Sequence, residues 1–317
     1  MLTHFFNHVV LDWSWLLPGP RNTLVWAPTQ TWYEKLKEVK TPEKWFKTYD
    51  VGKHTYAIIE PYNWEETISY LIIGKQKALL FDTGMGLSAI SRVVKQLTTL
   101  PVVVLNSHTH PDHIGGNAEF KTIYALNSPY TKHNAANGYT HNQVKWEVSP
   151  ESFCPDSLPN ADTAAYHIRP FNITGLIKDR DVIDIGDRRF TVISTPGHTP
   201  DAICLYEAAS GYFWCGDSFY LGPILLTDSV TDISKYKVSV SIMAAYANCS
   251  KIILPAHNLP IVRPQMVQRA NKCFRQIISG VKKGKTNQDG TITFDCGDFS
   301  YQIGEKFLSA YPLSQKQ

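Results

Sequence analysis

Short apolar runs rich in β-branched and aromatic residues recur from about residue 54 onward, and such runs predict β-strands. The first four runs are Thr55–Ile59, Ile68–Ile73, Ala78–Phe81 and residues 101–105. Before the fourth run, residues 88–97 carry apolar side chains at positions 90, 93, 94 and 97, which is the spacing of one helix face. Ser88 is the predicted N-cap of this helix.

The second half of the chain continues to mix strand and helix patterns. Strands are predicted at 181–185 and 190–194 around a Gly186-Asp187 turn, at 203–206 and 212–215 around Ser210-Gly211, and at 252–254. Helical spacing predicts helices at Ile233–Ala247 and at 264–280, the latter opened by Pro264 and closed by Gly280. Because strands and helices are interspersed throughout, the expected fold class is α/β or α+β.

Three segments lack a clean period. Residues 1–50 contain Trp13, Trp15, Trp26, Trp32 and Trp45, and they predict an irregular extension that covers core surface, lines a substrate pocket or makes a homodimer contact. Residues 139–170 are rich in Pro, Asn and Ser and predict a long loop insertion. Residues 282–317 predict a polar C-terminal tail, so the expected catalytic domain spans residues 51–281.

Composition mainly excludes partners. The 317 residues are 43% hydrophobic and 19% charged, and a net charge of +3 is too small to indicate nucleic acid or an anionic membrane as a partner. No run approaches the roughly 18 apolar residues of a transmembrane helix. The N-terminus lacks a basic region and is interrupted by Asp12, so we interpret it as part of a mature cytoplasmic protein.

The six cysteines carry no recognisable motif. They stand at positions 154, 204, 215, 249, 273 and 296, and none belongs to a C-x-x-C pair of a zinc ribbon or redox site. Disulfides stay an alternative, but buried reduced thiols are the preferred interpretation for a cytosolic protein.

The chemistry of the chain concentrates in the run His108-Thr109-His110-Pro111-Asp112-His113, which follows the strand at 101–105. Imidazole nitrogens and carboxylate oxygens are the ligands that zinc and similar metals take. One loop could therefore direct His108 and His110 to one metal, and Asp112 and His113 to a second metal close by. The following Gly115-Gly116 pair indicates a tight loop with a close backbone approach.

Three further ligand-type residues each stand just after a predicted strand. His198 follows the strand at 190–194, Asp217 follows the strand at 212–215, and His257 follows the strand at 252–254. Strand ends are where a rigid sheet presents functional loops. The sequence therefore predicts that these side chains meet the histidine run.

The pattern H-x-H-x-D-H, then G-H, G-D and a late histidine after an apolar strand resembles the metallo-β-lactamase superfamily. Phe81-Asp82-Thr83-Gly84 is similar to the aspartate–glycine turn that precedes the metal loop in that family. The resemblance runs from about His54 to about Gly280. It implies a four-layer αβ/βα sandwich with two metals at one edge, between the sheets.

The resemblance also implies a role for each matching residue. His108, His110 and His198 would bind the first metal; Asp112, His113 and His257 would bind the second; Asp217 would bridge the two. Asp82 would orient a ligand histidine from behind. The expected metals are two zinc ions, with iron or manganese as alternatives.

Two neighbouring cations lower the pKa of a bound water and would supply hydroxide at neutral pH. The expected enzyme is thus a metal-dependent hydrolase that opens an activated acyl bond, a lactone or thioester, of a small-molecule substrate. Asp112 could also steer a proton. Tyr220, three residues after Asp217, matches a tyrosine of the family's lactonases that can donate to the substrate carbonyl oxygen, and packing is its alternative role.

Other members of the family are less well matched. The β-lactamases proper lack the aspartate at the Asp217 position, and the flavin-linked diiron members usually have glutamate where this chain has His110. RNA-processing members carry nucleic-acid-binding elements, which this mildly charged chain does not show. A mononuclear iron sulfur dioxygenase stays the main alternative, and a non-catalytic scaffold is disfavoured by the complete set of ligands.

Overall fold

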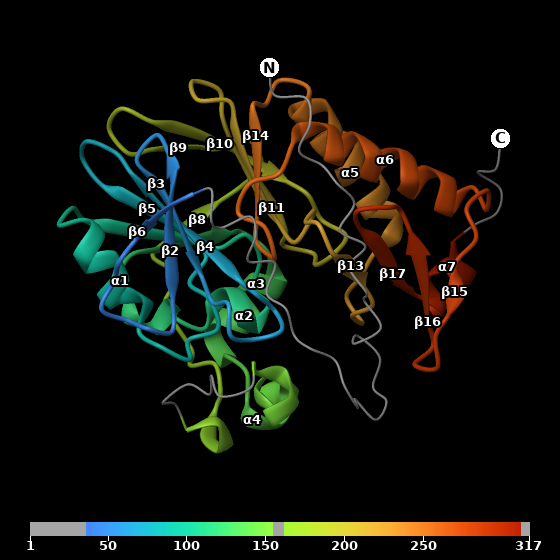
Figure 1. Cartoon of the computed structure of the whole chain (residues 1–317), viewed down its shortest axis with the longest axis horizontal. Helices are drawn as coiled ribbons and strands as arrows, with labels where there is room; N and C mark the ends of the chain where they lie inside the picture. The colour runs from blue at the N-terminus through green and yellow to red at the C-terminus, as the bar shows by residue number, and fades with distance from the viewer. Residues whose placement is uncertain (1–35, 155–161, 312–317) are drawn as a thin grey trace.

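The computed structural model describes residues 36–154 and 162–311 of the chain. Its first half forms an eight-stranded sheet whose strands lie in sequence order (Figure 1). The strands are β1 (Lys37–Val39), β2 (Lys47–Gly52), β3 (Thr55–Ile59), β4 (Ile68–Ile73), β5 (Ala78–Phe81), β6 (Val102–Leu105), β7 (Ile123–Leu126) and β8 (Gly175–Ile177). Pairing is antiparallel from β1 to β5 and parallel from β5 to β8.

The second half forms a five-stranded sheet. Across it the order is β14 (Ile252–Pro255), β12 (Tyr212–Gly216), β11 (Ile203–Glu207), β10 (Arg189–Ser194) and β9 (Val182–Asp184). Only β12 and β14 pair in parallel.

The two sheets face each other across one apolar core. Tyr70 and Phe81 from the first sheet are buried against Phe190 and Trp214 from the second. Helices cover the outer faces (Figure 1): α1 (Ile90–Leu97) and α3 (Pro129–Asn137) on the first sheet, α5 (Ile233–Ala247) and α6 (Pro264–Ile278) on the second. The predicted four-layer sandwich is confirmed, because each sheet buries one face on its partner and one on helices.

Most predicted elements form at their predicted places, but the first helix begins differently. The helix α1 starts at Ile90, with Ala89 as the N-cap and no side-chain hydrogen bond at the cap. Ser88 instead donates its hydroxyl to Glu43 Oε2 at 2.9 Å. The predicted N-cap role of Ser88 is therefore wrong, because the helix begins one residue later and Glu119 Oε2 accepts from the Ser91 amide of its first turn at 3.1 Å.

Part of the predicted irregular extension is regular. Residues 37–52 build β1 and β2, the outermost pair of the first sheet. Trp45 is buried in the connection between them and packs against Tyr62 and Phe153, with ring centroids 5.7 and 6.1 Å away. The other four tryptophans of the extension lie outside the described residues.

In the described parts of the predicted insertion, residues 139–154 and 162–170, the regular elements are short helical turns. They are α4 (His141–Val144) and the 3₁₀ turns η4 (Lys145–Val148), η5 (Pro150–Ser152) and η6 (Thr163–Ala165). In Figure 1 this segment protrudes below the first sheet. Its turns have no apolar period because they are too short to need one.

Residues after 281 supply three strands of a third sheet, and β13 (Pro223–Leu226) from earlier in the chain is its fourth strand. The order of this sheet is β13, β17 (Ser300–Gly304), β16 (Thr291–Asp295) and β15 (Lys285–Thr286), and α7 (Glu305–Ala310) follows. Phe294, Tyr301 and Ile303 bury this sheet against α5 and α6. The sequence analysis predicted none of these four strands.

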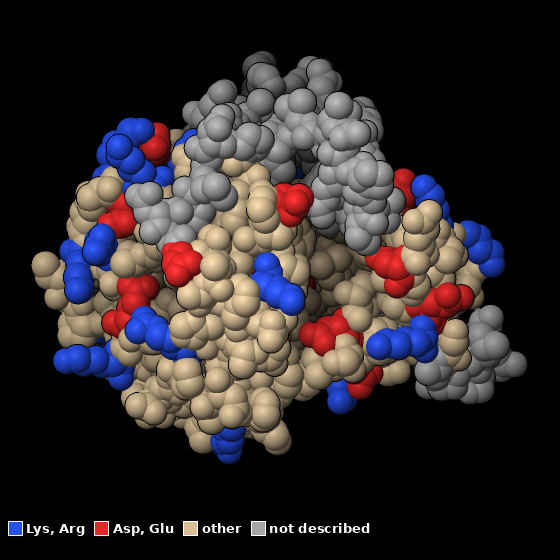
Figure 2. Space-filling model, turned by 90° about the horizontal axis from the view of Figure 1, so that it is seen from below, with Lys and Arg blue, Asp and Glu red and all other residues tan. Residues whose placement is uncertain are grey.

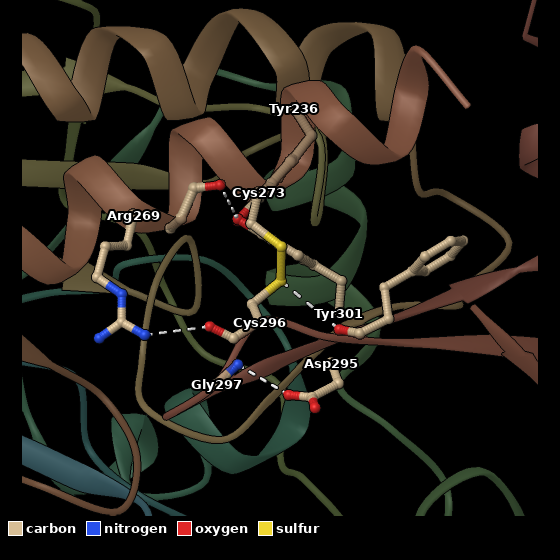
Figure 3. Close-up of a disulfide and its surroundings, with 9 residues drawn as sticks. Tyr236, Arg269, Cys273, Asp295, Cys296, Gly297 and Tyr301 are labelled. Atoms are coloured by element: carbon tan, nitrogen blue, oxygen red, sulfur yellow. Dashed lines mark hydrogen bonds between the residues drawn. A yellow bond between two sulfur atoms is a disulfide. The ribbon is translucent and has the colours of Figure 1, made fainter. Parts of the chain in front are cut away.

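A disulfide joins Cys273 of α6 to Cys296, just after β16 (Figure 3). Close by, Arg269 donates to the Cys296 carbonyl at 3.3 Å and Tyr301 donates to the Ala270 carbonyl at 3.3 Å. The interpretation of all cysteines as reduced thiols is therefore wrong for this pair. The other four, Cys154, Cys204, Cys215 and Cys249, are free thiols.

The surface carries charge of both signs. On the face seen in Figure 2, Lys and Arg side chains are interspersed with Asp and Glu, as the small net charge implies. Among the helices of the described residues, none has the length and apolar character needed to cross a membrane.

Candidate metal centre

All seven predicted ligands converge at one edge of the two facing sheets. His108 and His110 lie in the loop after β6, and Asp112 and His113 lie in the short helix α2 (Pro111–Ile114). His198, Asp217 and His257 follow β10, β12 and β14. Three groups bring their ligand atoms within 4.8 Å of one another: His108, His110 and His198; His108, His113 and Asp217; Asp112, His113 and His257.

Local chain geometry fixes the metal loop. Pro111 opens α2, where its missing N–H leaves no bond unmade. Gly115 follows, and a Cβ there would lie 2.1 Å from the Met85 carbonyl carbon, so only glycine allows this approach. The predicted close approach at Gly115 is thus confirmed, and it seats the loop on the turn after Asp82.

The first cluster has the spacing of a metal site. His198 Nε2 lies 3.0 Å from His110 Nδ1 and 3.5 Å from Asp217 Oδ2, and His108 Nε2 lies 3.9 Å from the same oxygen. Ligands about 2.0–2.2 Å from a tetrahedral zinc lie about 3.3–3.6 Å apart. The observed distances bracket that value.

The second cluster shares Asp217 with the first. Asp217 Oδ1 lies 3.0 Å from His257 Nε2 and 3.2 Å from His113 Nε2. Asp112 Oδ2 lies 2.9 Å from His113 Nε2 and 3.6 Å from His257 Nε2. The two oxygens of Asp217 therefore face different clusters, which is the arrangement that a bridging carboxylate requires.

Each of the five imidazoles is held through its other ring nitrogen. The partners are Ser107 Oγ for His108 (3.0 Å), Asp228 Oδ2 for His110 (3.2 Å), Asp82 Oδ2 for His113 (3.1 Å), the Leu225 carbonyl for His198 (2.8 Å) and the Glu65 carbonyl for His257 (2.6 Å). Such contacts fix the ring orientation of metal-binding histidines. The inward nitrogen of every ring is thereby left for the centre.

Several of the inward atoms have no hydrogen-bond partner although they are buried. They are His108 Nε2, His113 Nε2 and Asp217 Oδ1. Leaving a buried polar atom unsatisfied costs roughly 1–3 kcal/mol. Metal ions bound among these atoms would remove that cost, so the residues fit a metal centre.

Burial and neighbouring charges pull the pKa values of these groups apart. Burial disfavours the charged form of His113, but the carboxylates of Asp112, Asp217 and Asp82 outweigh it and raise its pKa well above the usual range. Burial and the nearby His110 lower the pKa of His198 to about 4. Burial works against ionised Asp217 too, yet the surrounding histidines hold its pKa well below its usual range.

Sequence reasoning missed several residues that support the centre. Asp228 lies 118 positions from His110 and follows β13, a strand that was not predicted. Asp82, in contrast, was predicted: it accepts from the Ser107 amide at 2.7 Å and contacts His113. Glu65 was also missed, because its contact to His257 is made by the backbone and has no sequence signal.

The loop between β3 and β4 ties the insertion to the second cluster. Thr67 donates to Asp112 Oδ2 at 3.3 Å, and Asn63 donates its side-chain amide to the Glu147 carbonyl at 2.9 Å. Glu147 is itself buried in the insertion, and burial with nearby Asp112 raises its pKa well above the usual range. Within the 139–170 segment, Glu147 thus lies near the second cluster.

Tyr220 lies beside the second cluster. Its ring centroid is 4.9 Å from that of His257, and its hydroxyl donates to the Pro223 carbonyl at 2.6 Å. A phenol has one proton to donate. Donation to a substrate would therefore require the Pro223 hydrogen bond to be released.

A family model described as the metallo-beta-lactamase superfamily matches residues 62–259. The chain belongs to the metallo-beta-lactamase superfamily. The match covers all seven predicted ligands, and the superfamily generally binds divalent metals. Membership confirms the predicted family and, at that level, a metal-dependent hydrolase.

Curated relatives within the superfamily include thioester hydrolases. An acyl-coenzyme A thioesterase MBLAC2 of Gallus gallus is 26% identical over 276 residues, which cover 78% of this chain and 98% of that protein. A hydroxyacylglutathione hydrolase of Gloeobacter violaceus is 26% identical over 121 residues, covering 38% of this chain and 36% of that protein.

Solved structures of the superfamily share the fold. The sec-alkylsulfatase Pisa1 of Pseudomonas sp. matches with a TM-score of 0.59 at 14% identity, covering 74% of this chain and 42% of that chain. The BLEG-1 B3 metallo-beta-lactamase matches with a TM-score of 0.50 at 18% identity, covering 67% and 94%. At such identities the likeness concerns the fold and not the substrate.

Proposed function

We propose that this protein is a dinuclear metal-dependent hydrolase of acyl thioesters. The observation that carries the proposal is Asp217, whose two oxygens face two separate clusters of inward-pointing imidazoles. A single-metal site would need only one of these clusters. In both clusters, each imidazole has a contact at the ring nitrogen that points away from the centre, and this supports both metal sites.

The proposed ligands keep the assignment made from the family pattern. His108, His110 and His198 hold the first metal; Asp112, His113 and His257 hold the second; Asp217 bridges them, and Asp82 orients His113. Zinc is the proposed metal, with iron or manganese as the alternatives, because imidazole and carboxylate ligands suit all three. When bound, the metals activate water at neutral pH and polarise the carbonyl group.

The residues around the centre orient the reaction. Asp112 uses Oδ2 toward His113 and His257, so its Oδ1 is the oxygen that we assign to steering a proton. Tyr220 is the proposed donor to the developing negative charge on the substrate oxygen. Its present bond to Pro223 makes this a donor that must be recruited when substrate binds.

The thioester is proposed ahead of the lactone because of the relatives. The Gallus gallus protein is named an acyl-coenzyme A thioesterase and aligns over 98% of its length, and the Gloeobacter violaceus protein is named a hydroxyacylglutathione hydrolase. Both names describe cleavage of a thioester. Lactone and thioester were equal expectations from the sequence, and the spacing of Tyr220 does not separate them, because acyl-thioester hydrolases of the family can share it.

The test is a hydrolysis panel with metal content measured on the same purified sample. The panel contains an acyl-coenzyme A, an S-acylglutathione, an acyl-homoserine lactone and a cephalosporin, with oxygen uptake on a glutathione persulfide as a fifth assay. We expect about two metal ions per chain and the fastest turnover on a thioester. If the lactone is hydrolysed fastest, the proposed thioester substrate is wrong. One iron per chain together with oxygen uptake would contradict the proposed hydrolysis. Only trace metal in active protein would overturn the metal centre.

A further inference from the structure

A buried carboxylate outside the ligand set connects the loops of the first metal site. Asp201 lies between β10 and β11 and is 1% exposed. Its Oδ2 accepts hydrogen bonds from Thr109 Oγ1 at 2.6 Å and from Thr131 Oγ1 at 2.9 Å. Its Oδ1 accepts from Thr199 Oγ1 at 2.7 Å. All three donors are neutral hydroxyl groups, and all are buried.

Two of these threonines are sequence neighbours of the proposed ligands of the first metal. Thr109 stands between His108 and His110, and Thr199 directly follows His198. The three histidines are the whole imidazole set of the first site. The Asp201 carboxylate therefore joins the two loops that supply the three histidines, although Thr109 and Asp201 lie 92 positions apart in the sequence.

The third contact anchors the pair of loops to the scaffold. Thr131 belongs to α3, which also sends Asn134 to donate to Thr109 Oγ1 at 2.9 Å. Tyr139 donates to the Thr109 carbonyl at 2.9 Å. Because Thr109 Oγ1 accepts from Asn134, its own proton is directed to Asp201, and the network has one consistent direction.

The second site lacks any such connection to Asp201. Asp112 and His257 are held by Thr67 and by the Glu65 carbonyl, in the loop between β3 and β4. His113 is held by Asp82. Asp82 also accepts from the Ser107 amide, and Ser107 Oγ contacts His108, so the two sites share this support, whereas the two ligand loops that Asp201 joins are those of the first site.

We infer that Asp201 is a positioning residue for the first metal site, setting its affinity by holding the His108–His110 loop and the His198 loop in register. A carboxylate suits this task because it accepts from several hydroxyls at once. An asparagine in its place keeps the shape but replaces an ionised acceptor by a neutral amide with one acceptor oxygen, so the hydrogen bonds to the two loops become weaker. The inference rests on the proposed metal centre and not on the thioester substrate.

The test is a Zn²⁺ titration of stripped protein against a chromophoric chelator, resolved into two dissociation constants. We expect Asp201→Asn to weaken one constant by about 10- to 100-fold, the usual effect of losing a contact behind a metal ligand, and to leave the other within about twofold. Thr199→Val should weaken the same constant, and Thr199→Ser, which keeps the hydroxyl, should restore it. Thr291→Val is the matched control, because it removes a buried threonine hydroxyl that donates to a carboxylate, Asp289 Oδ1 at 2.6 Å, in the third sheet and not in the Asp201 network.

Failure of the positioning role and failure of the proposed metal centre would give different results. The positioning role would be overturned if neither zinc dissociation constant changes in Asp201→Asn and in Thr199→Val. It would also be overturned if both constants weaken equally in these variants. The same weakening in Thr291→Val as in Thr199→Val would also overturn it, because general loss of packing would then be the cause. Wild-type protein that binds no zinc would overturn the metal centre itself. If Asp201→Asn does not fold, the Thr199 pair decides.

Discussion

Glu60 gives the structure a pH dependence whose size can be worked out. Its side chain is 1% exposed and lies under the turn that precedes the metal loop. Trp45 Nε1 donates to Oε2 at 2.6 Å, and the Met85 amide donates to Oε1 at 2.8 Å. Burial raises the pKa of this carboxyl from 4.5 to about 7, although both hydrogen bonds work in the opposite direction.

The sign and magnitude follow from the two pKa values. The folded state holds the Glu60 proton more tightly than the unfolded state does. The contribution of Glu60 to the unfolding free energy is therefore greatest below pH 4.5 and falls as the pH rises toward 7. A difference of about 2.5 between the pKa values, at about 1.36 kcal/mol each, corresponds to about 3 kcal/mol of unfolding free energy. Above pH 7 this contribution is constant.

The perturbation is Glu60→Gln, which removes the titration and keeps the shape. We expect the difference in unfolding free energy between variant and wild type to shift by about 3 kcal/mol in favour of the variant from pH 4.5 to pH 8. Urea unfolding at several pH values measures it, and taking the difference cancels the groups common to both proteins. The exposed Glu305→Gln is the matched control. Parallel stability curves for wild type and Glu60→Gln would refute the reasoning.

Three further outcomes are expected. Asp217→Asn should reduce the zinc bound per chain and lower kcat strongly with the fold intact, by elemental analysis, kinetics and circular dichroism; two tightly held metals with unchanged kcat would contradict the bridging role. Tyr220→Phe should lower kcat more than it raises KM, by less than the roughly 100- to 1000-fold typical of a lost oxyanion donor, because the metal acts on the same oxygen; unchanged kcat with metals retained would leave Tyr220 a packing residue. Replacing Cys273 and Cys296 by serine should cost about 3 kcal/mol, since the bond closes a loop of 23 positions; urea unfolding checks this against Cys249→Ser, and equal stability of the two would count against it.

Much of the sandwich and its ligand set could be predicted from sequence. The helix Ile233–Ala247 and the strands Thr55–Ile59, Ile68–Ile73 and Ala78–Phe81 form with the predicted bounds. Their apolar side chains are buried on both faces or on one, and local periodicity reports that burial directly. The candidate ligands could be found because four of them form a dense run after one predicted strand and three others each follow a further predicted strand.

Only the tertiary structure decided which distant groups support the ligands. Asp228 reaches His110 across 118 positions, and Asp201 reaches Thr109 across 92. Neither aspartate has a local pattern that separates it from a surface residue. Their contacts form because the fold brings distant segments of the chain together, and the packing of the two sheets sets which segments meet.

The third sheet and its disulfide were hidden for a related reason. The strands β15–β17 are short and contain many polar residues, and their stability comes from pairing with one another, from the pairing of β17 with β13, and from burial against α6. Cys273 and Cys296 meet because that docking brings their Cα atoms to 6.1 Å. The sequence alone thus determined the elements and the candidate ligands whose signal is local, and the tertiary structure determined the contacts whose partners lie far along the chain.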